Sequence, residues 1–239
     1  MSVALVTGAG IRLGRAIATA LAGDGFDLVL HYNRSKRDAV SLARELEALG
    51  RKAALVQADL GRGAAALKLA RAAEQKFGRV DLLVNSAAIF WPTPLEKLSA
   101  RELDAFLNVN LKAPYILSSE IGRRMKKRGG GAIVNIACIS GFRPWKNFVP
   151  YSISKAGVIA LTRGMARLLG PEVRVNAIAP GTVLPPEGMN KAGLEQLRRR
   201  LPLKRIGSPA DIVEAVLYLS RASFVTGQIL CVDGGRSIV

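Results

Sequence analysis

Strand-like and helix-like segments alternate along the whole chain, and this alternation constrains the fold more than any other feature. Apolar runs rich in β-branched residues occur at 3–7, 27–32, 53–58, 81–85, 132–137, 173–179 and 228–232. Between them, apolar side chains recur at helical spacing in 12–24, 36–49, 62–77, 99–127, 151–169 and 209–221. Such alternation places parallel strands in one sheet with helices on both faces. We therefore expect a Rossmann-like, doubly wound α/β fold of about seven strands, forming one domain over 1–239.

Composition excludes several classes of protein. Hydrophobic residues make up 49% of the 239 residues and charged residues 22%, which is ordinary for a globular chain and excludes disorder. No apolar run reaches the roughly 18 residues that a membrane helix needs. Two cysteines and a single histidine, His31, are too few for a disulfide framework or a histidine-based metal centre, so we expect no metal. The N-terminus has no cationic leader or cleavage pattern, so a cytoplasmic protein that does not associate with membranes is expected.

The net charge is unusual, because 35 lysines and arginines against 18 acids give +17. A field of this sign attracts anions such as nucleotide phosphates, nucleic acid or an acidic carrier protein. The cations are spread along the chain, with short clusters at 126–128 and 198–200 and no basic tail. This distribution favours a solvated basic surface, and we expect no nucleic-acid partner.

A glycine-rich turn, Thr7 to Gly14, follows the first expected strand. Gly8 permits the tight turn, and Gly14 allows the next helix to begin close to the sheet. The helix N-terminus then offers free N–H groups and the positive end of its dipole to a pyrophosphate. The turn therefore predicts nucleotide binding.

The end of the second strand indicates which nucleotide is bound. Sites that prefer NAD usually place an acid there for the ribose 2′-hydroxyl, but no acid follows His31 before Asp38. Arg34 and Ser35 instead offer a guanidinium fork and a hydroxyl, which suit a 2′-phosphate. The sequence favours NADP(H) as the cofactor, whereas His31 itself is expected to be a buried or rim imidazole and not a catalyst.

Tyr151 and Lys155 form the third motif. Their spacing places both side chains on one face of a helix. An ammonium beside a phenol favours the phenolate and lowers the pKa of the tyrosine. The pair therefore predicts a general acid–base that works near neutral pH.

One long connection, 180–208, lacks a clear strand. It opens with Pro180-Gly181, contains Pro185-Pro186 and ends in a short arginine-rich helix. A long loop beyond a strand end in such a sheet usually covers a ligand, so we expect a substrate loop or lid here.

With these motifs the chain resembles the short-chain dehydrogenase/reductase family over essentially its full length. The matching pieces are the turn 7–14, Asp59-Leu60, Asn85-Ser86-Ala87-Ala88, Asn110, Tyr151 with Lys155, Pro180-Gly181 and the strand 228–232 with Asp233-Gly234-Gly235. The resemblance implies that Asn110, Tyr151 and Lys155 belong to a catalytic tetrad, with Asn110 binding a water in a proton relay. It places a cofactor against Gly8, Arg12, Leu13, Gly14, Asn33, Arg34, Ser35, Asp59, Leu60, Asn85, Ser86, Ala87, Tyr151, Lys155, Pro180, Gly181, Thr182 and Val183.

At two positions, Arg12 and Phe90, the chain resembles the pteridine reductase subgroup of the family. Most members of the family carry glycine where this chain has Arg12, and Phe90 begins the segment 90–95 that follows Asn85. By that resemblance Phe90 stacks on a pterin ring, and Arg12 lies between the cofactor phosphate and the substrate. A flat, polar heterocycle held by an aromatic face and a guanidinium is physically reasonable; the alternative for Phe90 is core filling beside Trp91.

Position 138 departs from the family pattern. The family's serine lies 13 residues before the catalytic tyrosine, and pteridine reductases use aspartate there, but this chain has Cys138. A thiol is a weak hydrogen-bond donor. Cys138 can relay a proton, fill space, or leave the role to Ser140, which a strand would point to the same side.

Three functions remain open. The first is NADPH-dependent reduction of a C=N or C=O bond in a small, pterin-like molecule. The second is reduction of 3-oxoacyl groups on acyl carrier protein, with the cluster 126–128 as a docking patch, or another carbonyl or alcohol reaction of the family. The third is a non-catalytic cofactor-binding protein, against which the intact Tyr151 and Lys155 argue.

The family resemblance also implies a homotetramer. Its helical contacts would lie in 99–127 and 151–169, where we expect surplus apolar side chains: Ile116, Leu117, Ile121, Val158, Leu161 and Met165.

Overall fold

A single parallel sheet runs through the molecule in the computed structural model, which describes residues 2–184 and 190–239. Its strands are β1 (Val3–Val6), β2 (Asp27–Tyr32), β3 (Ala53–Gln57), β4 (Leu82–Asn85), β5 (Gly131–Ile136), β6 (Val173–Pro180) and β7 (Ile229–Val232). The strand order is β3-β2-β1-β4-β5-β6-β7. The chain therefore reverses its direction of progress between β3 and β4, as expected of a doubly wound sheet, and ligands bind at such a switch point beyond the carboxyl ends of the strands.

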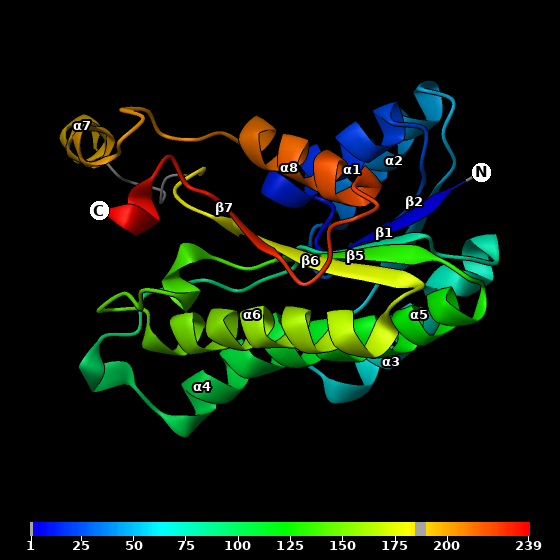
Figure 1. Cartoon of the computed structure of the whole chain (residues 1–239), viewed down its shortest axis with the longest axis horizontal. Coiled ribbons are helices and arrows are strands. Elements are labelled where there is room, and N and C mark those ends of the chain that lie inside the picture. The colour runs from blue at the N-terminus through cyan, green and yellow to red at the C-terminus, as the bar shows by residue number, and fades with distance from the viewer. Residues whose placement is uncertain (1, 185–189) are drawn as a thin grey trace.

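Helices cover both faces of the sheet (Figure 1). On one face lie α1 (Arg12–Gly23), α2 (Lys36–Ala48) and α8 (Pro209–Arg221); on the other lie α3 (Gly63–Phe77), α4 (Ala100–Leu107), α5 (Ala113–Lys127) and α6 (Val149–Leu169). Each face has its own apolar core, with Ile17, Leu42 and Ile212 in the first and Leu69, Leu117 and Met165 in the second. Within the described residues, no helix is both long enough and apolar enough to cross a membrane.

The seven strands and the principal helices lie where their periodicity predicts them, which confirms the fold class. The segment 99–127 differs, because a π-helical turn at Asn108–Lys112 separates α4 from α5. A π turn inserts an extra residue into the helical repeat and often marks a functional position. The arginine-rich helix expected within 180–208 is α7 (Lys191–Arg200).

The apolar side chains expected to form a surplus helix surface mostly lie inside the chain. Leu117, Ile121, Val158 and Met165 are buried, because they pack toward the sheet, so they are not available to a second subunit. Ile116 and Leu161 are partly buried against the same core. The tetramer remains a prediction that these residues do not support.

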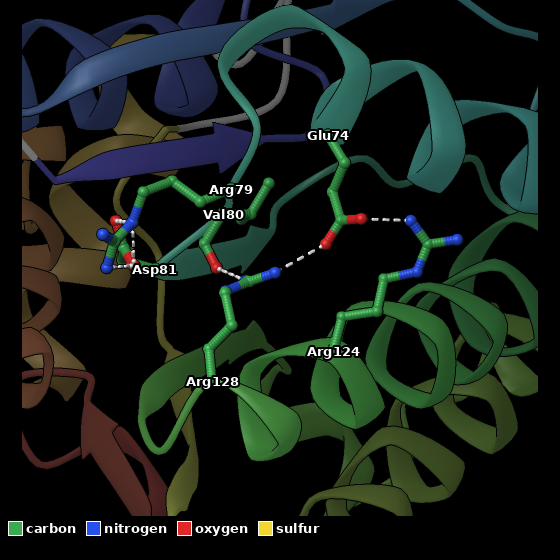
Figure 2. Close-up of polar contacts among 6 residues, drawn as sticks. All are labelled: Glu74, Arg79, Val80, Asp81, Arg124 and Arg128. Atoms are coloured by element: carbon green, nitrogen blue, oxygen red, sulfur yellow. Dashed lines mark hydrogen bonds and ion pairs between the residues drawn. The ribbon is translucent and has the colours of Figure 1, made fainter.

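Charged side chains tie helices together at the edge of the sheet where the strands begin, here called the amino edge. Glu74 of α3 forms ion pairs with Arg124 of α5 and with Arg128, the latter at 2.9 Å, and Arg128 also donates to the Val80 carbonyl at 2.8 Å (Figure 2). Beside them Arg79 pairs with Asp81 at 2.6 Å. The Glu74 contacts join α3 to the end of α5, and the Arg79–Asp81 pair lies within the segment just before β4.

This network changes the interpretation of the basic cluster 126–128. Arg128 belongs to the Glu74 network, and Lys126 pairs with Glu172 at 3.2 Å and donates to the Gly170 carbonyl at 2.9 Å. Two of the three cations are therefore held by the chain itself at the amino edge, whereas the strands of a doubly wound sheet present ligands at the opposite, carboxyl edge. The pairing and the position of the cluster do not support the docking patch that the charge suggests, which stays a prediction.

Candidate active site

The glycine-rich turn joins β1 to α1 at the carboxyl edge. Gly8 has φ of 67°, a backbone conformation that favours glycine, and a Cβ on Gly14 would collide with the Gly8 carbonyl. A Cβ on Gly10 would lie 2.5 Å from the Ser35 hydroxyl oxygen. The close packing of β1, the turn and α2 therefore depends on these glycines, and the N-cap residue of α1, Ile11, makes no side-chain capping bond.

Arg12 adopts the left-handed conformation, with φ of 52°, at the position where most of the family has glycine. This backbone costs a residue with a Cβ about 1–3 kcal/mol, so the surroundings must enforce it. Arg12 lines the pocket beside the glycine-rich turn, here called the turn pocket, and is not among the described residues that line the pocket around Tyr151. This position supports the cofactor side of the expected placement of Arg12, and its contact with a substrate stays a prediction.

The turn pocket has a volume of about 680 Å³. Many of the expected cofactor residues line it: Gly8, Arg12, Leu13, Gly14, Asn33, Arg34, Ser35, Asp59, Leu60, Ser86 and Ala87. Arg34 is exposed at the end of β2 and Ser35 is half-buried at the start of α2. The expected 2′-phosphate residues thus lie in the same cavity as the glycine-rich turn.

Asn85 lies outside this cavity. Its side chain is buried and donates to the Ser118 hydroxyl at 3.2 Å and to the Asn135 side-chain oxygen at 2.8 Å. The lining at this position instead comes from Ser86 and Ala87, whose backbone N–H groups donate to the Thr7 hydroxyl at 2.9 and 3.0 Å. Asn85 therefore joins β4 to β5 and α5 behind the pocket.

His31 forms part of the pocket wall, as a bridge between strands. Its Nδ1 accepts the Gly8 N–H at 3.0 Å, and its Nε2 lies 3.0 Å from the Ala58 carbonyl. Accepting at Nδ1 and donating at Nε2 requires the neutral imidazole. Burial lowers the pKa of His31, which agrees with that state. The expectation of a buried imidazole is met, and the imidazole additionally holds the glycine-rich turn.

Tyr151 and Lys155 lie on one face of α6, as expected, and both are buried. The Lys155 ammonium donates to the Ile136 carbonyl at 2.7 Å and lies 5.7 Å from the centre of the Tyr151 ring. Burial raises the pKa of Tyr151 well above its ordinary value, and the charge and hydrogen bond of Cys138 add to this effect. The expectation that the pKa of Tyr151 is lowered is therefore not met, because burial disfavours the charged phenolate.

Burial also lowers the pKa of Lys155 to about 8, against the opposing effect of the Cys138 charge. At neutral pH the pair is therefore a phenol beside an ammonium. A protonated phenol is suited to donating a proton, so the two groups together form a proton donor with a nearby positive charge.

The structure distinguishes Cys138 from Ser140 as the residue that lies beside Tyr151. Cys138 lines the pocket around Tyr151, here called the tyrosine pocket, and packs in the same buried cluster as the tyrosine. Ser140 does not line that pocket, and its buried hydroxyl has no hydrogen-bond partner within the described chain. The reason is that 139–141 forms a 3₁₀ turn, so the alternation of a strand does not carry Ser140 to the side of Cys138. The structure therefore favours Cys138 over Ser140 for a role beside Tyr151, and that role stays a prediction.

Asn110 lies in the π-helical turn and is buried. Its side chain accepts the Ile89 N–H at 2.8 Å and donates to the Ile89 carbonyl at 3.0 Å and to the Ser154 hydroxyl at 3.1 Å. Ser154 in turn donates to the Tyr151 carbonyl at 2.6 Å. Asn110 therefore connects the segment after β4 to the first turn of α6, and its amide is already occupied by protein partners.

An aromatic wall surrounds Tyr151. Phe90 is stacked on Phe148 with ring centres 4.7 Å apart and meets Tyr151 edge to face at 4.8 Å. Trp145 lies 6.4 Å from Phe90 and 6.5 Å from Tyr151. Phe90 is 45% exposed, so it is not core filling, but Phe148 covers one face of its ring. Sequence reasoning found Phe90 and missed Trp145 and Phe148, whose loop carries no periodic signal.

The tyrosine pocket has a volume of about 690 Å³ and adjoins the turn pocket, since Leu13, Ser86, Ala88 and Leu184 line both. Pro180, Gly181, Thr182 and Val183 line the tyrosine pocket, together with Gly193, Gln196, Leu197 and Arg200 of α7. The two ends of the expected lid 180–208 thus flank this cavity, while 185–189 lie outside the described residues. Lys146 and Arg236 also line the cavity, and sequence reasoning missed both.

Comparisons with known proteins agree with the fold. A family model described as enoyl-(acyl carrier protein) reductase matches residues 8–237. The 3-oxoacyl-[acyl-carrier-protein] reductase FabG of Staphylococcus epidermidis is 33% identical over 237 residues, which cover 97% of each chain.

Solved structures match equally well. The FolM alternative dihydrofolate reductase 1 of Brucella canis, complexed with NADP, has a TM-score of 0.93 and 33% identity, covering 100% of this chain and 94% of that one. A blue fluorescent protein from a metagenomic library, in complex with NADPH, has a TM-score of 0.91 and 34% identity, covering 98% of this chain and 97% of that one.

Proposed function

This chain is a member of the short-chain dehydrogenase/reductase family, and on that premise we propose that it is an NADPH-dependent reductase of a small, planar, pterin-like substrate. The chain is an oxidoreductase, and hydride would be transferred to a C=O or C=N bond. The observation that carries the choice of substrate is the aromatic wall, because Phe90 lies 4.8 Å from Tyr151. A flat ring gains from such a wall through stacking as well as burial.

The residues of the turn pocket fit NADP(H). The glycine-rich turn leaves no room for a Cβ at Gly14, so the backbone of the turn and of α1 can come close to a pyrophosphate. Arg34 and Ser35 would hold the 2′-phosphate, and Asp59 and Leu60 would flank the adenine. The cofactor, when bound, supplies the hydride. Two neighbours of known structure are complexed with NADP or NADPH, which supports this choice.

Tyr151 provides the proton for a carbonyl substrate. When hydride adds to the carbonyl carbon, a C–H bond forms and the π electron pair of C=O moves to oxygen. The Tyr151 hydroxyl, kept protonated by burial, gives its proton to that oxygen, and solvent replaces it. The Lys155 ammonium stabilises the transient phenolate by its positive charge. Each turnover thus consumes one hydride and one proton.

Reduction of 3-oxoacyl groups on a carrier protein is the second candidate. It is favoured by the relative from Staphylococcus epidermidis, which is named for that reaction. Against it stands the basic cluster 126–128, since two of its cations are held by Glu74 and Glu172 at the amino edge. A carrier would have to deliver its acyl group at the carboxyl edge.

A substrate panel separates the two candidates. We expect NADPH oxidation with 7,8-dihydrobiopterin or a quinonoid dihydropterin to exceed that with acetoacetyl-coenzyme A and with cyclohexanone. Phe90→Ala should lower kcat/KM for the pterin by about threefold to tenfold, which corresponds to the loss of one aromatic contact. The thioester should lose less, because a flexible chain gains little from stacking.

Phe142→Ala is the matched control, because Phe142 is 43% exposed, close to the value for Phe90, and lines neither pocket. Efficient turnover of the thioester with no turnover of any dihydropteridine would overturn the pterin-like substrate. The assignment of the cofactor and of Tyr151 would survive that result.

A further inference from the structure

The tyrosine pocket is strongly cationic. Lys146, Lys155, Arg200 and Arg236 line it, whereas none of its described lining residues is an aspartate or glutamate. Lys155 belongs to the catalytic pair, and Lys146 and Arg200 are exposed at the rim. Arg236 remains, half-buried beside the reacting groups, with no role assigned to it so far.

Arg236 is held in place by several contacts. It begins a 3₁₀ turn, Arg236–Ile238, just after β7, at the same end of the molecule as α7 (Figure 1). Its guanidinium lies 5.0 Å from the centre of the Trp145 ring and donates to the Thr182 hydroxyl at 2.5 Å. Stacking on an aromatic ring leaves the edge of a guanidinium, with its N–H groups, free to bind a planar acid.

The turn that carries Arg236 is itself anchored. The Asp233 carboxylate accepts the N–H groups of Gly235 at 2.9 Å and of Ser237 at 2.7 Å, and Arg143 donates to the Ser237 carbonyl at 3.2 Å. A charged group fixed in this way loses little conformational entropy when it binds a ligand.

The charge of Arg236 is not neutralised by an ion pair. Burial lowers its pKa, which is the sign of a desolvated cation, while Cys138 and Asp233 act in the opposite direction. Asp233 uses its oxygens to hold the turn, and no carboxylate of the described chain forms an ion pair with Arg236. Keeping a cation half-buried without such a partner is unfavourable, and an anionic ligand would relieve that cost.

We propose that Arg236 determines substrate specificity by pairing with an acidic group, a carboxylate or a comparable oxyanion, carried by a planar conjugated substrate. The aromatic wall contacts the ring of that substrate and Arg236 its acid. This inference rests on the proposed reductase function and adds to it a preference, among planar substrates, for those that carry an acid.

A matched ligand pair tests the proposal. Isatin-5-carboxylate and its methyl ester share one flat bicyclic ketone of similar size and differ in charge. We expect the acid to bind at least tenfold more tightly than the ester by titration calorimetry, with NADP⁺ present so that no turnover occurs, and again without the nucleotide. The same preference should appear in kcat/KM with NADPH.

Three variants locate the effect. Arg236→Gln should reduce the preference to within about threefold, and Arg236→Lys, which keeps the charge, should retain part of it. Lys127→Gln removes the same charge at the end of α5, near the amino edge and outside both pockets, so it should retain the full preference if the effect is local. Thermal unfolding followed by circular dichroism confirms that each variant is folded.

Equal binding of acid and ester, absence of binding by both, or an unchanged preference in folded Arg236→Gln would each overturn the proposal. An equal loss in Lys127→Gln would assign the preference to the net charge and would overturn it as well. Failure of the reductase function looks different, because NADPH oxidation would then be absent while the binding preference for the acid persisted.

Discussion

The two edges of the sheet use their positive charges in different ways. At the amino edge, cations are neutralised by the chain: Glu74 binds Arg124 and Arg128, and Asp81 binds Arg79 (Figure 2). Glu172 likewise binds Lys126. At the carboxyl edge, Arg34, Lys146, Arg200 and Arg236 line the two pockets and form no ion pair with a carboxylate of the described chain.

The contrast shows where the net charge of +17 acts. The cations paired with Glu74 at the amino edge hold α3 against α5, so we expect them to contribute to stability. At the carboxyl edge, cations without acidic partners produce a positive potential in the two pockets. This potential raises the local concentration of anions. The comparison therefore predicts that changes at one edge affect catalysis and cofactor choice, and that changes at the other affect the free energy of unfolding.

The largest effect should come from Tyr151→Phe. The variant loses the proton donor but keeps the ring that packs against Phe90, so kcat should fall about a hundredfold or more while cofactor binding and the melting temperature change little. Steady-state kinetics, NADPH titration and thermal unfolding measure the three quantities. Tyr115→Phe, at an exposed tyrosine of α5, should keep full activity. Near-full activity of Tyr151→Phe would place the acid elsewhere.

Alkaline pH should also affect the charges at the two edges differently. The pKa of Lys155 is about 8, so its ammonium is lost as pH rises through that value, and kcat/KM should fall by up to about tenfold per pH unit above it. At the amino edge, Asp81 raises the pKa of Arg79, while the backbone N–H of Glu172 and the side chain of Lys126 lower the pKa of Glu172, so these charges persist.

Over the same pH range, the contribution of Lys155 to stability should rise while kcat/KM falls. The folded value for Lys155 lies below its ordinary value of 10.5, so between these values the unfolded chain binds the proton and the folded chain does not. The contribution of Lys155 to the free energy of unfolding therefore rises with pH between about 8 and 10.5. For the activity, a pH–rate profile that stays flat to pH 10 would contradict the role of the Lys155 ammonium in catalysis.

Features that depend on neighbouring residues were predictable from the sequence. The strands and helices follow from local periodicity, and the glycine-rich turn and the Tyr151–Lys155 pair follow from fixed spacing. Of the alternatives for position 138, a substitute role of Ser140 is not supported, because a 3₁₀ turn replaces the strand at that point. The pKa direction for Tyr151 is wrong because spacing contains no information on burial.

Features that join distant parts of the chain were not predictable. Arg236 and Trp145 lie about 90 positions apart and meet only because the end of β7 folds back over the loop after β5, and one sequence contains no signal for that contact. Likewise, the sequence of the basic cluster 126–128 does not indicate that Glu74 and Glu172 form ion pairs with two of its cations. Charge patterns reveal net charge but not pairing.

Cofactor preference tests the carboxyl edge with a smaller effect. Arg34→Ala should reduce the preference for NADPH over NADH, expected to be at least about tenfold in kcat/KM, mainly by weakening NADPH, because one charge-assisted contact is worth about 1.5–3 kcal/mol. Arg37→Ala, an exposed arginine of α2 outside the turn pocket, should leave the ratio unchanged. Equal use of both nucleotides by the unmodified protein would remove the basis of this prediction.

The smallest effect is expected at the amino edge, from Glu74→Gln. Glu74 is 17% exposed and bridges two arginines whose side chains are about 30% exposed, so the substitution leaves two partly buried cations without their carboxylate. We expect a loss of about 1–2 kcal/mol in the free energy of unfolding by urea titration, with kcat and cofactor preference unchanged.

Glu195→Gln is the matched control, because Glu195 also contacts two arginines, Arg198 and Arg199, but within one turn of α7 and in solvent. It should cause no measurable loss of stability, since exposed pairs are screened by water and salt. Equal destabilisation by the two substitutions would mean that the amino edge is not specially stabilised by its ion pairs. A fall in kcat with Glu74→Gln would mean that the two edges are not independent.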